Sequence, residues 1–247
     1  MKMRSVMGVF CIMSLVPLAA FAQERITAAV AANFIEPFGE IARAFEKGTR
    51  IQVEPVFSST GKLYAQISEG APFDVFLSAD RKRPEELFRK GLSGRPFVYA
   101  NGVVVLWTTR KDLCGAGDWR AVIARTDVKK ISIANTETAP YGAASMAALQ
   151  AAGLWEGSRT KLVFPQDIAQ SFQYAFTGSV DAGFCALSSA LSAQGARGCY
   201  LVVNEAPPVV QAACVLNGTQ QKTAAEKFAA FLGSPEAKTV KKRYGYR

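Results

Sequence analysis

Residues 26–33 read ITAAVAAN, a mostly apolar run with three β-branched members that closes on a polar residue. Such a run indicates a buried strand, and Asn33 then stands where it would cap a following helix. Apolar side chains recur at helical spacing over 35–45, and Gly48 follows where a helix would end. The chain is therefore expected to open with a strand and an amphipathic helix.

The same alternation continues to residue 90. Strands are predicted at 51–57 and 73–78, and helices at 62–69 and 84–90. A parallel sheet with crossover helices is the expected product of this order. For the rest of the chain, the pattern predicts strands at 103–107, 131–134, 161–164, 182–186, 200–203 and 209–216. It predicts helices at 143–152, 168–176, 188–193, 224–232 and 235–242.

This order fits two α/β lobes better than one continuous sheet. The expected first lobe combines residues 23–102 with 208–247, and the second holds 103–207. Gly102 and the pair Pro207-Pro208 mark the two crossings between them. Each lobe is expected to be a mainly parallel sheet flanked by helices.

The composition is that of a globular protein. The chain has 247 residues, of which 49% are hydrophobic and 20% charged, so intrinsic disorder is excluded. It contains no histidine. Mechanisms that need a Ser-His or Cys-His pair, or a histidine-bound zinc, are therefore excluded. No direct cation site is predicted.

The N-terminus has the three parts of a secretory signal peptide. Lys2 and Arg4 precede an apolar stretch over 5–18, and a small-x-small site ends at Ala22. Cleavage after Ala22 is expected, which would deliver the protein to the periplasm. A retained membrane anchor is the alternative, but Pro17 and the short apolar length argue against it.

Charge and cysteine content describe the exported chain further. Removal of residues 1–22 takes away two positive charges and lowers the net charge from +9 to +7. The basic residues are scattered, so nucleic-acid binding is not expected, and the run 241–243 is interpreted as a solvated helix end. Four cysteines remain, with three possible pairings if they form disulfides; buried thiols are the alternative for Cys185 and Cys214, and no pairing is chosen.

Two polar turns follow predicted parallel strands, at 31–34 and 58–61. Ligands bind beyond the carboxyl ends of such strands, where helix N-termini offer N–H donors to an anion. Simple helix capping is the alternative for each turn. Glycine-rich phosphate motifs are absent, and Asp74, Asp80 and Asp181 have no obvious partner for acid–base work, so an enzyme is not expected.

The order of motifs resembles that of the periplasmic molybdate-binding proteins. Residues 26–33 and 57–63 resemble the two ligand turns of that family, and 70–80, GAPFDVFLSAD, is similar to its most recognisable segment. Residues 101–105 resemble the entry to the second lobe, and 231–245 the closing helix. The resemblance covers essentially the whole chain after the signal peptide.

Such a resemblance implies a two-lobed, type II periplasmic-binding-protein fold and a ligand that is an oxyanion. The protein would serve an ABC importer as a monomer, hand molybdate or tungstate to a membrane permease, and need no cofactor. The family's ligand positions fall on Asn33, Ser59, Thr60, Tyr141 and Ile168.

Three positions depart from the family pattern. Asn33 replaces a serine of some members, Tyr141 stands where others have a small residue after proline, and a tyrosine that others use is matched here by Ala186. Tyr141 would then supply a phenol or its backbone N–H, and Ile168 its backbone N–H. A sulfate, phosphate or organic-anion binding protein is one alternative, and a ligand-sensing module without transport is another.

Overall fold

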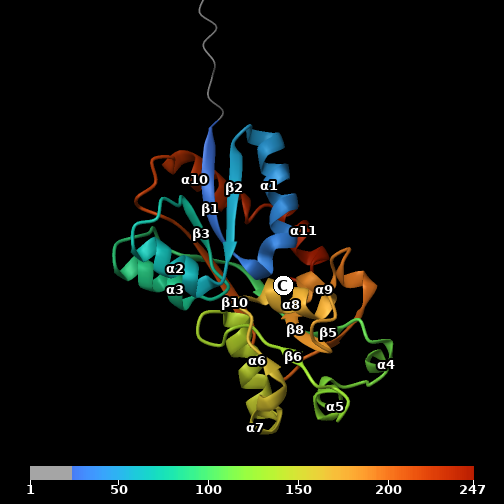
Figure 1. Ribbon diagram of the computed structural model, residues 1–247. Coiled ribbons are helices and arrows are strands. Elements are labelled where there is room, and N and C mark those ends of the chain that lie inside the picture. The colour runs from blue at the N-terminus through green and yellow to red at the C-terminus, as the bar shows by residue number, and fades with distance from the viewer. Residues whose placement is uncertain (1–23) are drawn as a thin grey trace, which may run out of the picture.

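The computed structural model describes residues 24–247, so the predicted signal peptide lies outside the described residues. Two five-stranded sheets lie one above the other and form two lobes (Figure 1). No helix among the described residues is long and apolar enough to cross a bilayer. The C-terminal end of the chain lies at the boundary between the lobes (Figure 1).

The first sheet has the order β2-β1-β3-β10-β4. Strand β1 runs parallel to β2 and β3, whereas β10 runs antiparallel to β3 and β4. These strands are β1 Arg25–Ala31, β2 Gln52–Ser58, β3 Val75–Leu77, β4 Phe97–Gly102 and β10 Val209–Val215.

The second sheet repeats the arrangement in the order β7-β6-β8-β5-β9. Strand β6 runs parallel to β7 and β8, and β5 runs antiparallel to β8 and β9. Its strands are β5 Val104–Thr108, β6 Ile131–Ser132, β7 Leu162–Val163, β8 Ala182–Ala186 and β9 Cys199–Val202.

Both sheets are therefore mixed, and the expectation of mainly parallel sheets needs correction. The cause lies at the crossings. Strand β4 leaves the first lobe where β10 enters it, and β9 leaves the second lobe near the point where β5 enters. Strands that leave and enter a sheet at the same edge must run in opposite directions when they pair.

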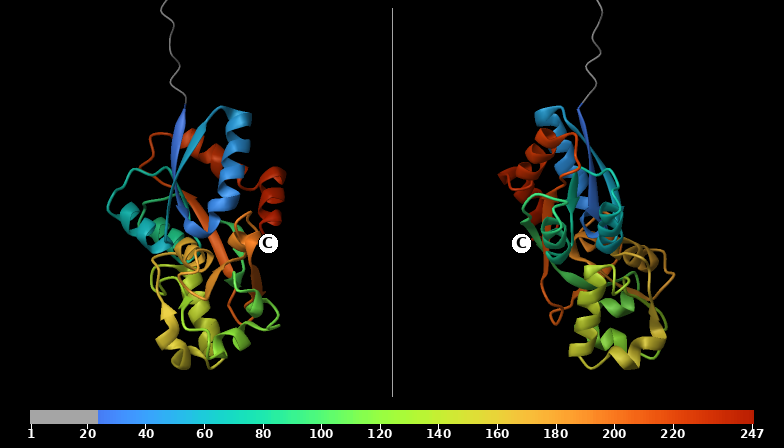
Figure 2. Two further views of the ribbon diagram at one scale, coloured as in Figure 1. Left: turned by 45° about the vertical axis from the view of Figure 1, so that its right-hand side comes forward. Right: turned by 90° about the vertical axis from the view of Figure 1, so that its left-hand side faces the viewer.

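Helices cover both faces of each sheet (Figure 2). On the first sheet, α1, α10 and α11 pack on one face and α2 and α3 on the other. Their bounds are α1 Ile35–Thr49, α2 Thr60–Ser68, α3 Lys82–Arg89, α10 Lys222–Phe231 and α11 Pro235–Arg243. The second sheet carries α4 Lys111–Cys114, α5 Trp119–Ala124, α6 Pro140–Ala151, α7 Trp155–Ser158, α8 Ile168–Phe176 and α9 Leu187–Ala190.

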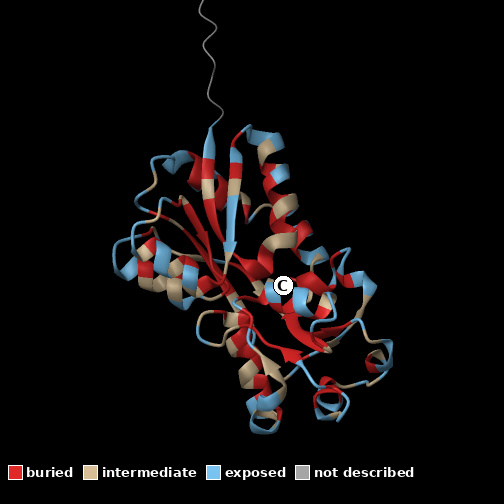
Figure 3. Ribbon diagram, viewed as in Figure 1, coloured by how far each residue is buried: buried red, intermediate tan, exposed pale blue. Residues whose placement is uncertain are grey.

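Burial on both faces explains the apolar character of the strands. Each sheet is sandwiched between two apolar clusters, and its central strands are buried along their length (Figure 3). Helix α1 contributes Phe38, Ile41 and Phe45, each at most 1% exposed. Full burial of such a side chain stabilises the fold by roughly 1.5–3 kcal/mol. The helix ends at Thr49, and its C-cap is Arg50, which takes the left-handed conformation, and not Gly48 as predicted.

The structure resolves the open question of the cysteines. Cys114 and Cys199 form a disulfide that ties α4 to the edge strand β9, and Cys185 and Cys214 are buried thiols.

The structure also corrects the interpretation of the basic run near the C-terminus. Lys241 is buried, and its Nζ donates to the carbonyl oxygens of Tyr99 and Leu232 at 2.6 and 2.9 Å.

Candidate functional site

A small, almost filled pocket with a free volume of about 10 Å³ lies between the two lobes. Besides Ala79, which follows β3, four chain segments line it: the turn after β1, the start of α2, the start of α6 and the start of α8. All five residues that the sequence singled out contribute to its wall, together with Asp167: Asn33, Ser59, Thr60, Tyr141 and Ile168.

Each of these segments is the first turn of a helix. The 3₁₀ turn η1 Ala32–Phe34 leads straight into α1, and α2, α6 and α8 begin at Thr60, Pro140 and Ile168. The first N–H groups of a helix have no acceptor within it, and the helix dipole makes that end partly positive. Two such ends come from each lobe, so the pocket is surrounded by N–H donors.

The hydroxyls of α2 add further donors. Ser59 Oγ is buried at the pocket and has no hydrogen-bond partner among the described residues. Thr60 Oγ1 accepts the N–H of Ala79 at 3.0 Å, which leaves its own proton for another acceptor. A buried donor without a partner costs about 1–3 kcal/mol, so Ser59 indicates a ligand with acceptor atoms.

Asn33 occupies the pocket wall but does not cap the helix, so that prediction is wrong. The N-terminus of η1 has no side-chain cap. The Asn33 amide Nδ2 donates instead to Gln211 Oε1 at 2.9 Å and to the Tyr246 hydroxyl at 3.0 Å. Both amide protons are thereby used, and the backbone N–H of Asn33 is the donor that it can offer to the pocket.

The Tyr141 hydroxyl is likewise engaged by another side chain and does not serve as a donor to the pocket. Its phenolic oxygen accepts from Gln211 Nε2 at 3.2 Å, and a Cβ built on Gly102 would overlap it. Burial raises the pKa of the Tyr141 hydroxyl well above its usual value, so the phenol stays neutral. The backbone N–H of Tyr141 follows Pro140 in the first turn of α6 and has no partner among the described residues. Ala186, the counterpart of the family's tyrosine, is not among the residues that line the pocket.

The pocket holds no lysine or arginine, and its one carboxylate is Asp167. Sequence analysis missed this residue, although an aspartate directly before the predicted helix start at Ile168 is a capping signal. Asp167 Oδ1 accepts the N–H of Gln170 at 3.0 Å. The carboxylate is therefore bound to its own helix.

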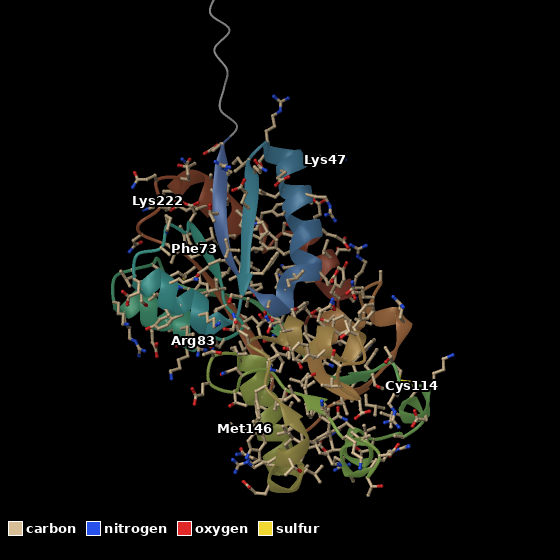
Figure 4. The ribbon with its side chains drawn as sticks, viewed as in Figure 1. Lys47, Phe73, Arg83, Cys114, Met146 and Lys222 are labelled. Carbon is tan, nitrogen blue, oxygen red and sulfur yellow. A yellow bond between two sulfur atoms is a disulfide. The ribbon has the colours of Figure 1, made fainter. Side chains whose placement is uncertain are left out.

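The lobes are closed over the pocket. The Gly61 N–H donates to the carbonyl oxygen of Thr138 at 2.8 Å, from α2 to the segment that precedes α6. Arg83 projects at the lobe boundary (Figure 4), where it pairs with Asp80 and donates through Nη2 to the Glu137 carbonyl oxygen at 2.9 Å. Both contacts join one lobe to the other beside the pocket.

Comparisons with known proteins agree with this architecture. A family model described as bacterial extracellular solute-binding protein matches residues 26–247. The chain belongs to that family. Two curated relatives, both named molybdate-binding protein ModA, are similar along nearly their whole length, and the resemblance seen in the sequence is confirmed. The relative from Rhodobacter capsulatus is 38% identical, with 90% of this chain and 87% of the relative covered; that from Azotobacter vinelandii is 40% identical, with 94% and 93% covered.

Solved structures give the same fold. The periplasmic molybdate-binding protein of Azotobacter vinelandii superposes with a TM-score of 0.82 at 32% identity, covering 90% of this chain and 98% of that one. A sulfate-binding protein of Mycobacterium tuberculosis reaches a TM-score of 0.76 at 13% identity, covering 91% and 86%. That second likeness concerns the fold alone.

Proposed function

We propose that this protein is the periplasmic binding component of an ABC importer and that it takes up molybdate, and tungstate with it, between its lobes. The observation that carries the proposal is the convergence of four helix N-termini, with the unpartnered Ser59 hydroxyl, on one pocket without a cationic side chain. The names of the relatives at 38–40% identity support molybdate as the ligand.

The chemistry of the donors suits a fully ionised oxyanion. Such an anion has only acceptor atoms, and N–H and O–H groups satisfy them without burying a cation. The proposed donors are the backbone N–H groups of Asn33, Tyr141 and Ile168 and the hydroxyls of Ser59 and Thr60. Asp167 also lines the pocket, but a carboxylate has only acceptor atoms and gives the anion no donor; its Oδ1 accepts the N–H of Gln170 in the α8 cap.

Lobe closure is the proposed means of delivery. An anion that contacts both lobes stabilises the closed form through its differential affinity, and a permease can then distinguish the loaded protein. We take residues 23–102 with 208–247 as one rigid lobe and 103–207 as the other, since each group carries one complete sheet. In this proposal the protein acts after cleavage at Ala22, as a monomer, without a cofactor, without nucleic acid and without catalysing a reaction.

Isothermal titration of residues 23–247 tests the proposal. Molybdate or tungstate should bind tightly at one site per chain, while sulfate and phosphate give no heat. Thr60→Ala and Asn33→Ala should both weaken molybdate binding. If neither molybdate nor tungstate gives binding heat, the proposed ligand is wrong. If both variants fold and bind molybdate with unchanged affinity, the proposed site is wrong.

A further inference from the structure

A buried hydrogen-bond network lies behind the pocket. Its side chains come from both lobes and from the C-terminal end of the chain, and none is more than 6% exposed. The members are Asn33, Tyr99, Tyr141, Ser188, Gln211 and Tyr246. Two of them, Asn33 and Tyr141, also form the pocket wall.

The Tyr246 hydroxyl binds both the side-chain amide and the backbone carbonyl group of Asn33. This hydroxyl accepts from Asn33 Nδ2 at 3.0 Å and donates to the Asn33 carbonyl oxygen at 2.7 Å. Ser188 Oγ, from the other lobe, donates to the same carbonyl at 2.7 Å. The chain end that carries Tyr246 is itself fixed, because Arg247 and Asn101 exchange backbone hydrogen bonds at 2.9 and 3.1 Å.

Gln211 joins the two pocket walls through one amide. Its Oε1 accepts from Asn33 Nδ2 and from the Tyr99 hydroxyl, each at 2.9 Å. Its Nε2 donates to the Tyr141 hydroxyl at 3.2 Å. Asn33 belongs to the first sheet's lobe and Tyr141 to helix α6 of the second, so Gln211 fixes both donors relative to each other.

We propose that Tyr246 and Gln211 are positioning residues for the anion, which they never touch. They hold the side chains of Asn33 and Tyr141 so that the backbone N–H groups of these residues keep facing the pocket. Preorganised donors bind more tightly because the cost of ordering them is met before the ligand arrives. This inference rests on the proposed function and deepens it by assigning part of the affinity to a network outside the pocket.

The packing of Tyr246 makes a clean test possible. The Phe34 ring lies edge-on to the Tyr246 ring at 5.2 Å and to the Tyr99 ring at 5.0 Å. Tyr246→Phe therefore keeps the ring contacts and removes only the hydroxyl. Tyr244→Phe is a matched control, because the Tyr244 hydroxyl donates to Glu40 Oε1 at 2.7 Å and takes no part in the network.

Molybdate affinity, dissociation rate and unfolding temperature of the ligand-free protein are measured for wild type and both variants. We expect Tyr246→Phe to weaken binding about tenfold, mainly through faster dissociation, and Tyr244→Phe to stay within twofold of wild type. A merely structural role would lower the unfolding temperature and leave the affinity unchanged. Equal affinities of Tyr246→Phe and Tyr244→Phe would overturn the inference.

A second variant tests whether the two residues act through the same donors. Gln211→Met should also weaken binding, and the double variant with Tyr246→Phe should lose less than the product of the two single effects, since both act on Asn33. Independent, multiplicative losses would overturn the inference. If the wild type binds molybdate and these variants bind it equally well, only the role of the network is contradicted. If the wild type does not bind molybdate, the proposed function is contradicted, and the inference with it.

Discussion

Gly61 donates its backbone N–H to the carbonyl oxygen of Thr138 across the boundary between the lobes, at 2.8 Å. The approach leaves no room for a side chain. A Cβ on Gly61 would lie 2.9 Å from the Thr138 Cα and 3.0 Å from its carbonyl oxygen. Because this contact joins the lobes beside the pocket, it belongs to the closed form.

Gly61→Ala should therefore oppose closure. We expect molybdate affinity to fall at least tenfold, while the unfolding temperature of the ligand-free protein holds or rises, because alanine favours the α2 helix over glycine by about 1 kcal/mol. Titration measures the affinity, thermal unfolding of the ligand-free protein measures the stability, and small-angle scattering with and without molybdate measures the closure. Gly48→Ala is the control, since a Cβ there meets nothing within 4 Å. Full affinity in Gly61→Ala would show that the lobes close in another way.

Arg83 provides a second contact of the closed form, through its bond to the Glu137 carbonyl oxygen at 2.9 Å. Arg83→Met keeps the length of the side chain and loses the donor. Molybdate should then dissociate faster and bind about fivefold more weakly, in line with a partly exposed hydrogen bond to a charged group. Arg81→Met is the control, because Arg81 directly precedes α3, is exposed and pairs with Glu85 of that helix, within the same lobe. Stopped-flow release rates that match in the two variants would argue against this contact.

A Ser59 variant should change molybdate affinity without destabilising the ligand-free fold. Its hydroxyl has no partner among the described residues, so Ser59→Ala removes no hydrogen bond from the ligand-free fold. We expect the unfolding temperature without ligand to hold or rise, because an unpartnered buried hydroxyl is unfavourable, and molybdate affinity to fall at least tenfold. Thermal unfolding with and without molybdate measures both at once. If the ligand raises the unfolding temperature of Ser59→Ala as much as that of wild type, Ser59 is not a donor to the anion.

The disulfide should matter for stability and not for binding. Cys114 and Cys199 are 85 residues apart, and neither lines the pocket. Replacing both by serine should lower the free energy of unfolding by about 2–5 kcal/mol, because the unfolded chain regains the freedom of a long loop. Urea denaturation measures this change, and molybdate affinity should stay within twofold. An equal midpoint for the double variant and the oxidised wild type would contradict the expected stabilisation.

Much of the fold follows from local sequence patterns. The strand predicted at 182–186 and the helix at 168–176 have the bounds that the structure gives them, because strong apolar patterns between turn residues define both. Strand β4 and the short helices α4, α5 and α7 were missed. Helices of four to six residues leave little periodicity to recognise, and β4 ends in Asn101-Gly102, which reads as a turn.

One half of the pocket was predictable because parallel strands end on one side of a sheet, where the polar turns at 31–34 and 58–61 must meet. The other half, Tyr141 and Ile168, came only from the family resemblance. The orientation of the pocket side chains was not predictable. The partners of the Asn33 amide, Gln211 and Tyr246, lie 178 and 213 residues further along the chain. From the neighbouring sequence alone, an asparagine that caps a helix cannot be distinguished from one whose amide binds residues far along the chain. The pairing of Cys114 with Cys199 and the burial of Lys241 depend on tertiary contacts in the same way.

The central claim is that one oxyanion sits where four helix N-termini meet, and anomalous diffraction tests it most directly. Crystals of residues 23–247 grown with molybdate, or soaked with tungstate, locate the metal atom independently of the refined structure. We predict a single strong anomalous peak in the pocket, with oxygen atoms within hydrogen-bonding distance of Ser59 Oγ and of the backbone N–H groups of Tyr141 and Ile168. A peak elsewhere, or an empty pocket in a protein that binds molybdate in solution, would contradict the site.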